Sequence, residues 1–99
     1  MKVTVKPFLF LRKALGFNEL EVDLDNNATV LELLRKLREQ YGLTEELSTA
    51  SGTLVLFDDD NLIGLMVLVD GRNIKQLDGT ATVLHESAVI TLFPPAAGG

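Results

Sequence analysis

Hydrophobic and polar residues alternate along several segments of the chain, and the alternation is cleanest over residues 19–25. Leu20, Val22 and Leu24 are separated there by acidic residues, so this strand is expected to bury one face and expose the other. The hydrophobic pattern predicts further strands over residues 3–11, 54–57, 65–69, 72–77 and 88–93. Pro7 lacks an N–H group, so the first of these strands must place it at an edge or a bulge.

One helix is predicted after the second strand, beginning at Thr29. Thr29 and Glu32 have the spacing of a capping box, in which two side chains satisfy free backbone N–H groups at the start of a helix. The following hydrophobic residues recur at the spacing of one helix face, which is expected to be buried: Val30, Leu33, Leu34, Leu37 and Tyr41. Gly42 is a suitable residue to end the helix.

Short polar or glycine-containing segments predict the connections between these elements. Turns are expected at residues 15–18, 58–61, 70–71 and 78–79, and a short helical turn at residues 45–47. Pro94 and Pro95 end the last strand because neither can donate to a strand ladder. The resulting order is strand, strand, helix and then further strands. This order predicts one α+β domain with the helix packed on one face of a sheet.

The composition excludes several classes of protein and several kinds of functional site. The chain has 99 residues, 46% of them hydrophobic and 23% charged, which fits one globular domain. It contains no Cys and one His, which excludes disulfides and cysteine nucleophiles and disfavours a transition-metal site. The net charge of −5 argues against nucleic acid as a partner. The longest apolar run, residues 63–69, is too short to span a bilayer, and no signal peptide precedes the first strand, so we expect a soluble, cytoplasmic domain.

The chain shows no constellation of residues that is typical of catalysis. His85, Glu86 and Ser87 are consecutive, so their side chains do not converge as those of a catalytic triad do. The acidic loop at residues 58–60 could attract a divalent cation, but it lacks the spaced ligands of a calcium loop and is expected to be neutral for function. The acidic residues of the strand at 19–25 are expected to face solvent, with a basic partner as the alternative. We therefore expect a protein that is not an enzyme.

The C-terminal tail carries the most distinctive chemistry of the sequence. After Phe93 come only prolines and small residues: Pro94, Pro95, Ala96, Ala97, Gly98 and Gly99. The prolines stiffen the start of the tail, and glycine lets a backbone approach another molecule closely. A tail of this kind can enter a narrow channel and present the carboxylate of Gly99 to another protein. The alternative is a terminus without a function, since termini are often small and frayed.

Several of these features together resemble the ubiquitin-like β-grasp sulfur carriers. The matching segments are residues 8–12 with Gly16, the helix from Thr29, the turn at residues 69–71 and the terminal segment 90–99. The pattern is most similar to the small subunit of molybdopterin synthase and to the small archaeal modifier proteins. The resemblance implies a β-grasp fold, with a mixed sheet of four to five strands and one main helix on one face. It also implies a domain over residues 1–93 and a flexible tail over residues 94–99 that is mobile when no partner is bound.

The resemblance further implies what the carboxylate of Gly99 does. An ATP-dependent enzyme of the ubiquitin-activating type adenylates it, and sulfur is then loaded as a thiocarboxylate. In the molybdopterin branch the tail enters the large subunit of molybdopterin synthase and donates sulfur to a pterin precursor. In the modifier branch the same carboxylate is joined to lysines of target proteins. ATP belongs to the activating partner, and the domain itself is expected to bind neither a cofactor nor a metal ion.

A tail this short needs a docking surface beside it. The candidate residues are Val89, Thr91 and Phe93 on the last strand, Phe8 and Phe10 on the first strand, and Arg12 nearby. The residues of the last strand share one parity, and they line the open face of the sheet if the alternate residues face the helix. The family fold sets the first and last strands side by side, which brings the other candidates close. The alternative for Phe8 and Phe10 is that one of them packs under the long connection, and Phe93 remains the best candidate for partner binding.

Two parts of the sequence depart from the family pattern, and several alternatives stay open. Residues 85–87 stand where the family carries a glycine-containing turn, and the segment 43–62 is longer than in the shortest members. The pattern agrees equally well with sulfur donation, with protein modification and with both. A third hypothesis is a non-covalent binding module whose tail is incidental.

Overall fold

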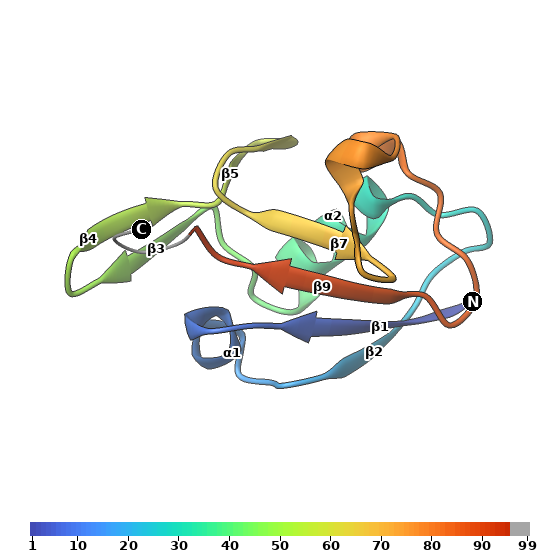
Figure 1. Cartoon of the computed structure of the whole chain (residues 1–99). Coiled ribbons are helices and arrows are strands. Elements are labelled where there is room, and N and C mark those ends of the chain that lie inside the picture. The colour runs from blue at the N-terminus through green and yellow to red at the C-terminus, as the bar shows by residue number, and fades with distance from the viewer. Residues whose placement is uncertain (96–99) are drawn as a thin grey trace.

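A mixed five-stranded sheet forms the centre of the structure, a computed structural model that describes residues 1–95 (Figure 1). Its strands are β1 (Lys2–Pro7), β2 (Leu20–Asp23), β7 (Met66–Val69), β8 (Arg72–Asn73) and β9 (Val89–Phe93). They lie in the order β2-β1-β9-β7-β8, with β1 and β9 parallel and every other neighbouring pair antiparallel. The α+β class expected from the sequence is therefore confirmed.

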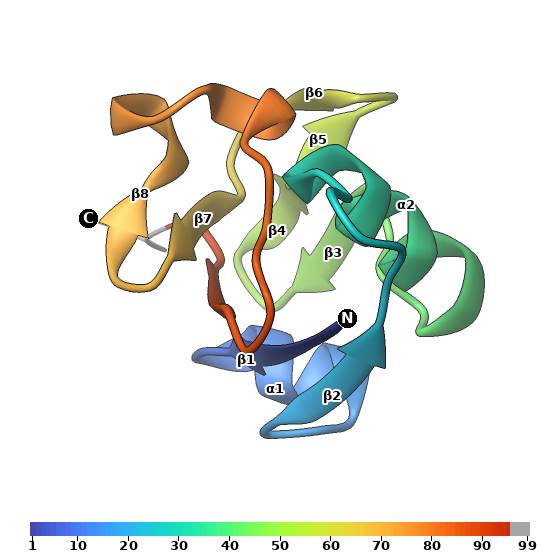
Figure 2. The same cartoon turned by 90° about the vertical axis from the view of Figure 1, so that its right-hand side faces the viewer.

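The main helix, α2 (Val30–Gln40), lies on one face of this sheet (Figure 2). It begins where the capping box predicts, because the Thr29 hydroxyl oxygen accepts a hydrogen bond from the Glu32 N–H at 3.3 Å. Its apolar face packs against inward residues of the sheet that are also buried: Val3, Val5, Val22, Val67, Ile90 and Leu92. This packing, more than helix propensity, stabilises α2. No helix within residues 1–95 is long and apolar enough to cross a membrane.

The strand predicted over residues 3–11 is wrong beyond Pro7. The chain leaves the sheet there and forms the short helix α1 (Phe10–Leu15). Leu9 makes the turn between the two elements with a positive φ of 54° and is 61% exposed. Leu11, by contrast, lies within α1 and is buried. Both leucines share one parity in the sequence, so alternation alone could not show that only one of them is buried.

The segment between α2 and β7 forms two hairpins. β3 (Glu46–Thr49) pairs with β4 (Gly52–Val55), and β5 (Phe57–Asp58) pairs with β6 (Asn61–Leu62). The helical turn expected at residues 45–47 is therefore wrong, and the strand expected at residues 54–57 is divided between β4 and β5. Leu47 lies opposite Leu54 in the first hairpin, so pairing with a partner strand overrides the weak local preference for a helix. Figure 1 shows this hairpin extending beyond the end of the sheet.

The acidic loop between β5 and β6 has a structural role. Asp60 accepts a hydrogen bond from Arg35 of α2 at 2.6 Å and lies 3.5 Å from Arg38. The Arg38 guanidinium stands 4.8 Å from the centre of the Phe57 ring. The hydrogen bond from Arg35 is the main cause that lowers the pKa of Asp60, so this carboxylate stays charged in its ion pairs. Within residues 1–95, no group of three or more His, Cys, Asp or Glu side chains is placed to hold a metal ion.

The turns around β8 agree closely with the sequence pattern. Asp70 and Gly71 both adopt a positive φ, 50° and 84°, as a tight two-residue hairpin turn requires. The strand predicted over residues 72–77 shortens to β8, because Ile74–Gln76 forms a 3₁₀ helix that is capped by the preceding asparagine. A second 3₁₀ helix, Gly79–Ala81, lies at the next predicted turn.

A histidine and an aspartate join the turn after β7 to the loop before β9. His85 Nε2 lies 2.5 Å from one carboxylate oxygen of Asp70, and the other oxygen accepts the Val89 N–H at 2.9 Å. The hydrogen bond to Asp70 is the main cause that raises the pKa of His85 above its ordinary value. Burial raises the pKa of Asp70, but hydrogen bonds from Val89 and His85 outweigh this effect and leave the pKa below its ordinary value. Ser87, with a φ of 66°, turns the chain between His85 and the start of β9.

This pair predicts a pH-dependent stability. The raised pKa of His85 stabilises the fold below about pH 6.5, and this contribution is lost as the pH rises through the pKa of the folded state. The lowered pKa of Asp70 stabilises the fold above about pH 4, and this contribution is lost as the pH falls. We expect the melting temperature of the native protein to exceed that of His85→Gln at about pH 5, and the difference to shrink by about pH 8.5. Thermal unfolding followed by circular dichroism measures the difference.

Asp70→Asn provides the control for this prediction. The amide keeps an oxygen for the Val89 N–H but carries no charge. In the Asp70→Asn background, His85→Gln should change the melting temperature by an amount that depends much less on pH, because only the contact of His85 with the Glu86 carbonyl still raises its pKa. A difference with the same pH dependence in both backgrounds would contradict the pairing of the two side chains.

Candidate functional site

The tail begins at the end of β9, a strand in the interior of the sheet. β9 pairs with β1 on one side and with β7 on the other, and it ends at Phe93 (Figure 1). Pro94 is buried and Pro95 is half-buried, so both prolines pack against the domain. Residues 96–99, and with them the two glycines and the mobility expected of the tail, lie outside the described residues. The described site is the surface from which the tail leaves.

Two phenylalanine rings stack at the point where the tail begins. The ring centres of Phe8 and Phe93 are 4.7 Å apart, and the ring planes differ by 15°. Because β1 and β9 are parallel, both strands end at the same edge of the sheet, and the Phe8 N–H donates to the Leu92 carbonyl at 2.9 Å. Both rings are half-buried, so each keeps surface for a partner. The structure thus places Phe8 beside Phe93, as the resemblance to the family implied.

Helix α1 adds a basic side chain to these rings. The Arg12 guanidinium stands 4.8 Å from the centre of the Phe8 ring, a distance typical of a cation–π contact. Its Nε donates to the Pro7 carbonyl at 3.0 Å, which holds the side chain over the ring. The placement of Phe10 on the first strand is wrong, because the strand ends at Pro7 and Phe10 is the first residue of α1.

Alternate residues of β9 face opposite sides of the sheet. Ile90 and Leu92 have no exposed surface and pack on the side of α2. Val89, Thr91 and Phe93 are half-buried and face the other side. Val89 is the first residue of the strand and is therefore furthest along it from the tail. Of the three candidates on this strand, Thr91 and Phe93 lie nearer to the start of the tail.

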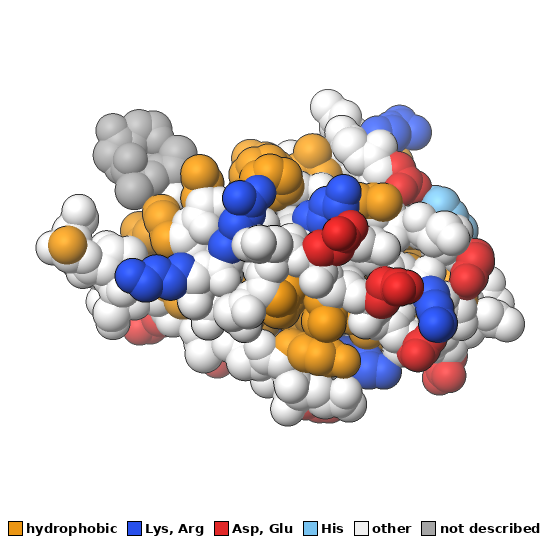
Figure 3. All heavy atoms as spheres, turned by 90° about the horizontal axis from the view of Figure 1, so that it is seen from below, with side chains coloured by type: hydrophobic (Ala, Val, Ile, Leu, Met, Phe, Trp, Pro, Cys, Tyr) orange, Lys and Arg blue, Asp and Glu red, His pale blue; other side chains and the backbone are white. Residues whose placement is uncertain are grey.

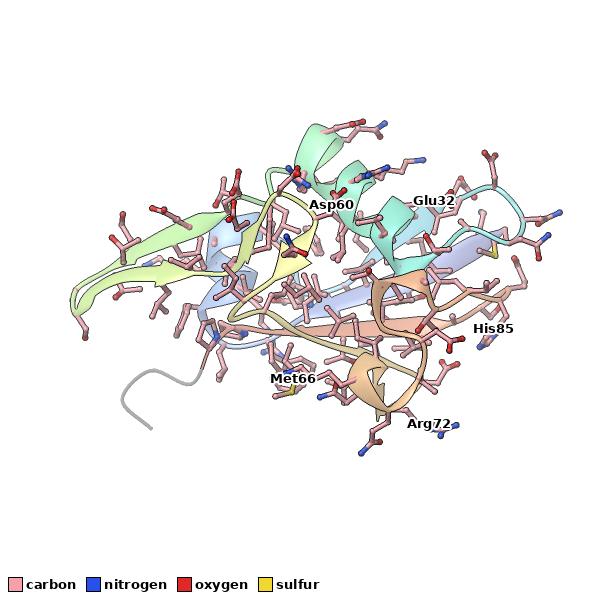
Figure 4. The ribbon with its side chains drawn as sticks, turned by 90° about the horizontal axis from the view of Figure 1, so that it is seen from above. Glu32, Asp60, Met66, Arg72 and His85 are labelled. Carbon is pink, nitrogen blue, oxygen red and sulfur yellow. The ribbon has the colours of Figure 1, made fainter. Side chains whose placement is uncertain are left out.

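The sequence pattern did not reveal three exposed hydrophobic residues of this region. Met66 lies opposite Phe93 in the register of β7 and β9 and is 47% exposed. Figure 4 shows Met66 on the side of the sheet away from α2. Ile63 is 60% exposed and precedes Gly64, which lies against Pro95. Leu9 is 61% exposed and follows Phe8, whose ring stacks on Phe93. Residues 63–69 are too uniformly apolar for alternation to assign a face, so only the register with β9 could have placed Met66.

Basic side chains lie beside this apolar surface. Lys6 is opposite Thr91 in the register of β1 and β9 and lies 3.8 Å from a carboxylate oxygen of Glu19. In Figure 3, hydrophobic and basic side chains are neighbours toward the left, and most acidic side chains lie toward the right. On the face seen in that view, most acidic side chains therefore lie away from the end where the tail begins. We call the following residues the tail-root surface: Phe8, Arg12, Met66, Thr91 and Phe93.

The tail-root surface can bind a partner, but its residue types do not support catalysis. It contains two aromatic rings, a thioether, a hydroxyl group and a guanidinium, and none of its members is a His, Asp or Glu. Acid–base and nucleophilic mechanisms need a titratable group or a nucleophile paired with a base.

Comparison with known proteins gives consistent similarities over the whole chain. The ThiS family matches residues 5–99. Small archaeal modifier protein 3 from Haloferax volcanii is 32% identical over 100 residues, which cover all of both chains. The crystal structure of SAMP1 from the same organism has a TM-score of 0.77 and 26% identity, again over all of both chains. A putative molybdopterin converting factor, subunit 1, from Pyrococcus furiosus has a TM-score of 0.71 and 26% identity, over 97% of this chain and 99% of its own.

These similarities confirm the β-grasp fold and the class of protein. The family match includes the described sheet except the first residues of β1, together with α2 and the terminal segment that follows β9. Proteins of this kind are small carriers or modifiers and are not enzymes. The chain belongs to the ThiS family of ubiquitin-like β-grasp sulfur carriers and modifiers.

Proposed function

We propose that this protein carries sulfur, or is joined to other proteins, through the carboxylate of Gly99. The observation that supports this most is the start of the tail. There, an interior strand of the sheet leads directly into two prolines beside the stacked rings of Phe8 and Phe93. The tail-root surface would hold a partner enzyme while the tail reaches the partner's reaction centre. Membership of the family supports the same role.

The chemistry requires an activating partner, because a carboxylate is a poor electrophile. An oxygen of Gly99 attacks the α-phosphate of ATP, which forms an acyl-adenylate and releases pyrophosphate. Hydrosulfide then attacks the carbonyl carbon, displaces AMP and leaves a thiocarboxylate. Alternatively, a lysine amine displaces AMP, loses a proton and leaves an isopeptide bond. The partner would be an enzyme of the ubiquitin-activating type, and ATP would bind to that enzyme.

The names of the relatives come from both branches of this chemistry. One relative is a small archaeal modifier protein, and another is a putative subunit of a molybdopterin converting factor. Both routes begin from the same acyl-adenylate, so one tail can supply both. The proposed partners are therefore the activating enzyme, the large subunit of molybdopterin synthase and lysines of target proteins.

Intact-mass spectrometry of the tagged protein from its native cells tests this proposal. We expect part of the protein to gain the mass difference between sulfur and oxygen, or to appear as conjugates with its C-terminal segment on a target lysine. Deletion of Gly99 should abolish both products, because the deletion removes the carbonyl that is activated. Val83→Ala truncates an exposed side chain elsewhere on the domain and should keep both products.

Each outcome of this experiment assigns a role. A thiocarboxylate alone would assign sulfur donation, conjugates alone would assign modification, and both together would mean that one activated carboxylate supplies two routes. Products that persist without Gly99 would contradict the proposal. If neither product formed under several growth conditions, a non-covalent binding module would be the better account, with the tail-root surface as its binding site.

A further inference from the structure

Gly64, in the connection between β6 and β7, leaves room for the start of the tail. A Cβ atom added to Gly64 would clash with the Pro95 ring and with the Val55 carbonyl oxygen. Every other glycine within residues 1–95 has a positive φ and nothing near the position of an added Cβ. Conformational freedom therefore explains the other glycines, whereas the lack of space explains Gly64.

The register of β7 and β9 accounts for this contact. Met66 lies opposite Phe93, and each step back along β7 matches one step forward along β9. Continued for two steps beyond the last paired residues, this register would set Gly64 opposite Pro95, in agreement with the position of the Pro95 ring beside Gly64. Pro95 has no N–H group to continue the ladder, so its ring occupies the space that a side chain at position 64 would fill.

The backbone around Gly64 is held in place from the core. The N–H groups of Ile63, Gly64 and Leu65 all donate to the carbonyl oxygen of Leu56, at 2.9, 3.1 and 3.0 Å. Leu56 is fully buried, and its own N–H donates to the Glu45 carbonyl at 2.7 Å. An added Cβ would therefore meet two groups. The Pro95 ring, which lies beyond the end of β9, can shift more readily than the Val55 carbonyl, which belongs to a paired strand.

We propose that Gly64 is a positioning residue that sets the direction in which the C-terminal tail leaves the sheet. This inference rests on the proposed function of the Gly99 carboxylate. Four residues follow Pro95, and they can extend about 14 Å. A small rotation at Pro95 therefore becomes a large displacement of the carboxylate. The protein would still bind its activating enzyme through the tail-root surface, but the carboxylate would be misplaced relative to ATP.

Gly64→Ala tests this assignment in an ATP–pyrophosphate exchange assay with the activating enzyme from the same cells. We expect kcat to fall about tenfold or more, while KM changes less than about twofold because the docking surface is unchanged. Gly71→Ala is the matched control, since Gly71 lies beyond the opposite end of β7, has a φ of 84° and has open space around it. That variant should lose stability and keep the native kcat.

Pro95→Gly tests the same contact by removing the proline ring, whereas Gly64→Ala adds a side chain that meets it. If the ring and Gly64 act through their contact, Gly64→Ala should have a much smaller effect on kcat in a Pro95→Gly background, where only the contact with the Val55 carbonyl remains. An equal effect in both backgrounds, or a native kcat in a folded Gly64→Ala protein, would overturn the assignment. If Gly64→Ala does not fold, Pro95→Gly alone should still lower kcat, and an unchanged kcat would overturn the assignment.

Nuclear magnetic resonance separates failure of this assignment from failure of the proposed function. We expect nuclear Overhauser contacts between Gly64 and the Pro95 ring, whether or not an enzyme activates the tail. Gly64→Ala should also change the residual dipolar couplings of the residues after Pro95. If the native protein were never activated, the proposed function would fail, and native couplings in Gly64→Ala would overturn the role of Gly64 independently.

Discussion

Leu33→Ala should lower the free energy of unfolding by about 3 kcal/mol. Leu33 has no exposed surface (0%) on the buried face of α2, so truncation loses its contacts and leaves a cavity between the helix and the sheet. A loss of this size is a large part of the roughly 5–15 kcal/mol that stabilises a typical domain. Urea unfolding followed by circular dichroism measures the change.

Glu39→Ala is the matched control for Leu33→Ala. Glu39 lies on the same helix but is exposed, and its truncation should change the free energy of unfolding by less than about 0.5 kcal/mol. Similar losses for the two variants would contradict the conclusion that burial against the sheet dominates the stability of α2.

Phe93→Ala should raise KM for the activating enzyme about tenfold or more, with a smaller effect on kcat. The ring is half-buried, stacks on Phe8 and lies opposite the exposed Met66, so truncation removes an aromatic anchor from the centre of the tail-root surface. The tail and its carboxylate stay as they are. Phe93→Ala is therefore expected to change mainly KM, whereas Gly64→Ala is expected to change mainly kcat. Steady-state kinetics of pyrophosphate exchange distinguishes the two.

A double-mutant cycle tests whether Phe8 and Phe93 act together in binding the activating enzyme. Phe8→Ala and Phe93→Ala should not be additive in KM, because each removes one half of the same stack. Val83→Ala truncates a side chain that is 55% exposed and lies outside the tail-root surface, and it should leave KM unchanged. If a folded Phe93→Ala protein kept the native KM, the tail-root surface would not be the docking site.

The elements that could be predicted from the sequence are those with strong local signals. Thr29 and Glu32 located the start of α2, and the strict alternation around Val22 located β2. Asp70 and Gly71 located the hairpin turn after β7 because few residue pairs adopt two successive positive φ angles. In each case the free energy that selects the conformation arises within a few neighbouring residues.

Other elements depend on partners that are distant in the sequence. Strand β3 forms because Leu47 and its neighbours pair with β4, and the local pattern suggested a helical turn there. Strand β1 stops at Pro7 because the chain turns at Leu9 to bury Leu11, a choice that the hydrophobic pattern leaves undecided. The acidic loop was expected to be neutral for function, and in the structure its Asp60 forms an ion pair with Arg35 of α2.

The residues of the candidate site also fall into two groups, those that the sequence singled out and those that it did not. The tail and Phe93 stood out in the sequence because a strand that leads into two prolines, two alanines and two glycines is unusual in composition. Met66 did not stand out, because a uniformly apolar strand gives no indication of which face each residue occupies. Phe10 was placed wrongly because the end of β1 was placed wrongly.

The sequence by itself determined the order of strands and main helix, the buried face of α2 and the unusual composition of the tail, since these depend on the order and type of neighbouring residues. The tertiary structure alone decided which side chains surround the start of the tail. Gly64 and Pro95 are far apart in the chain, and nothing in their local sequences relates them. Their contact follows from the register of β7 and β9, which is set by packing of the whole sheet against the helix.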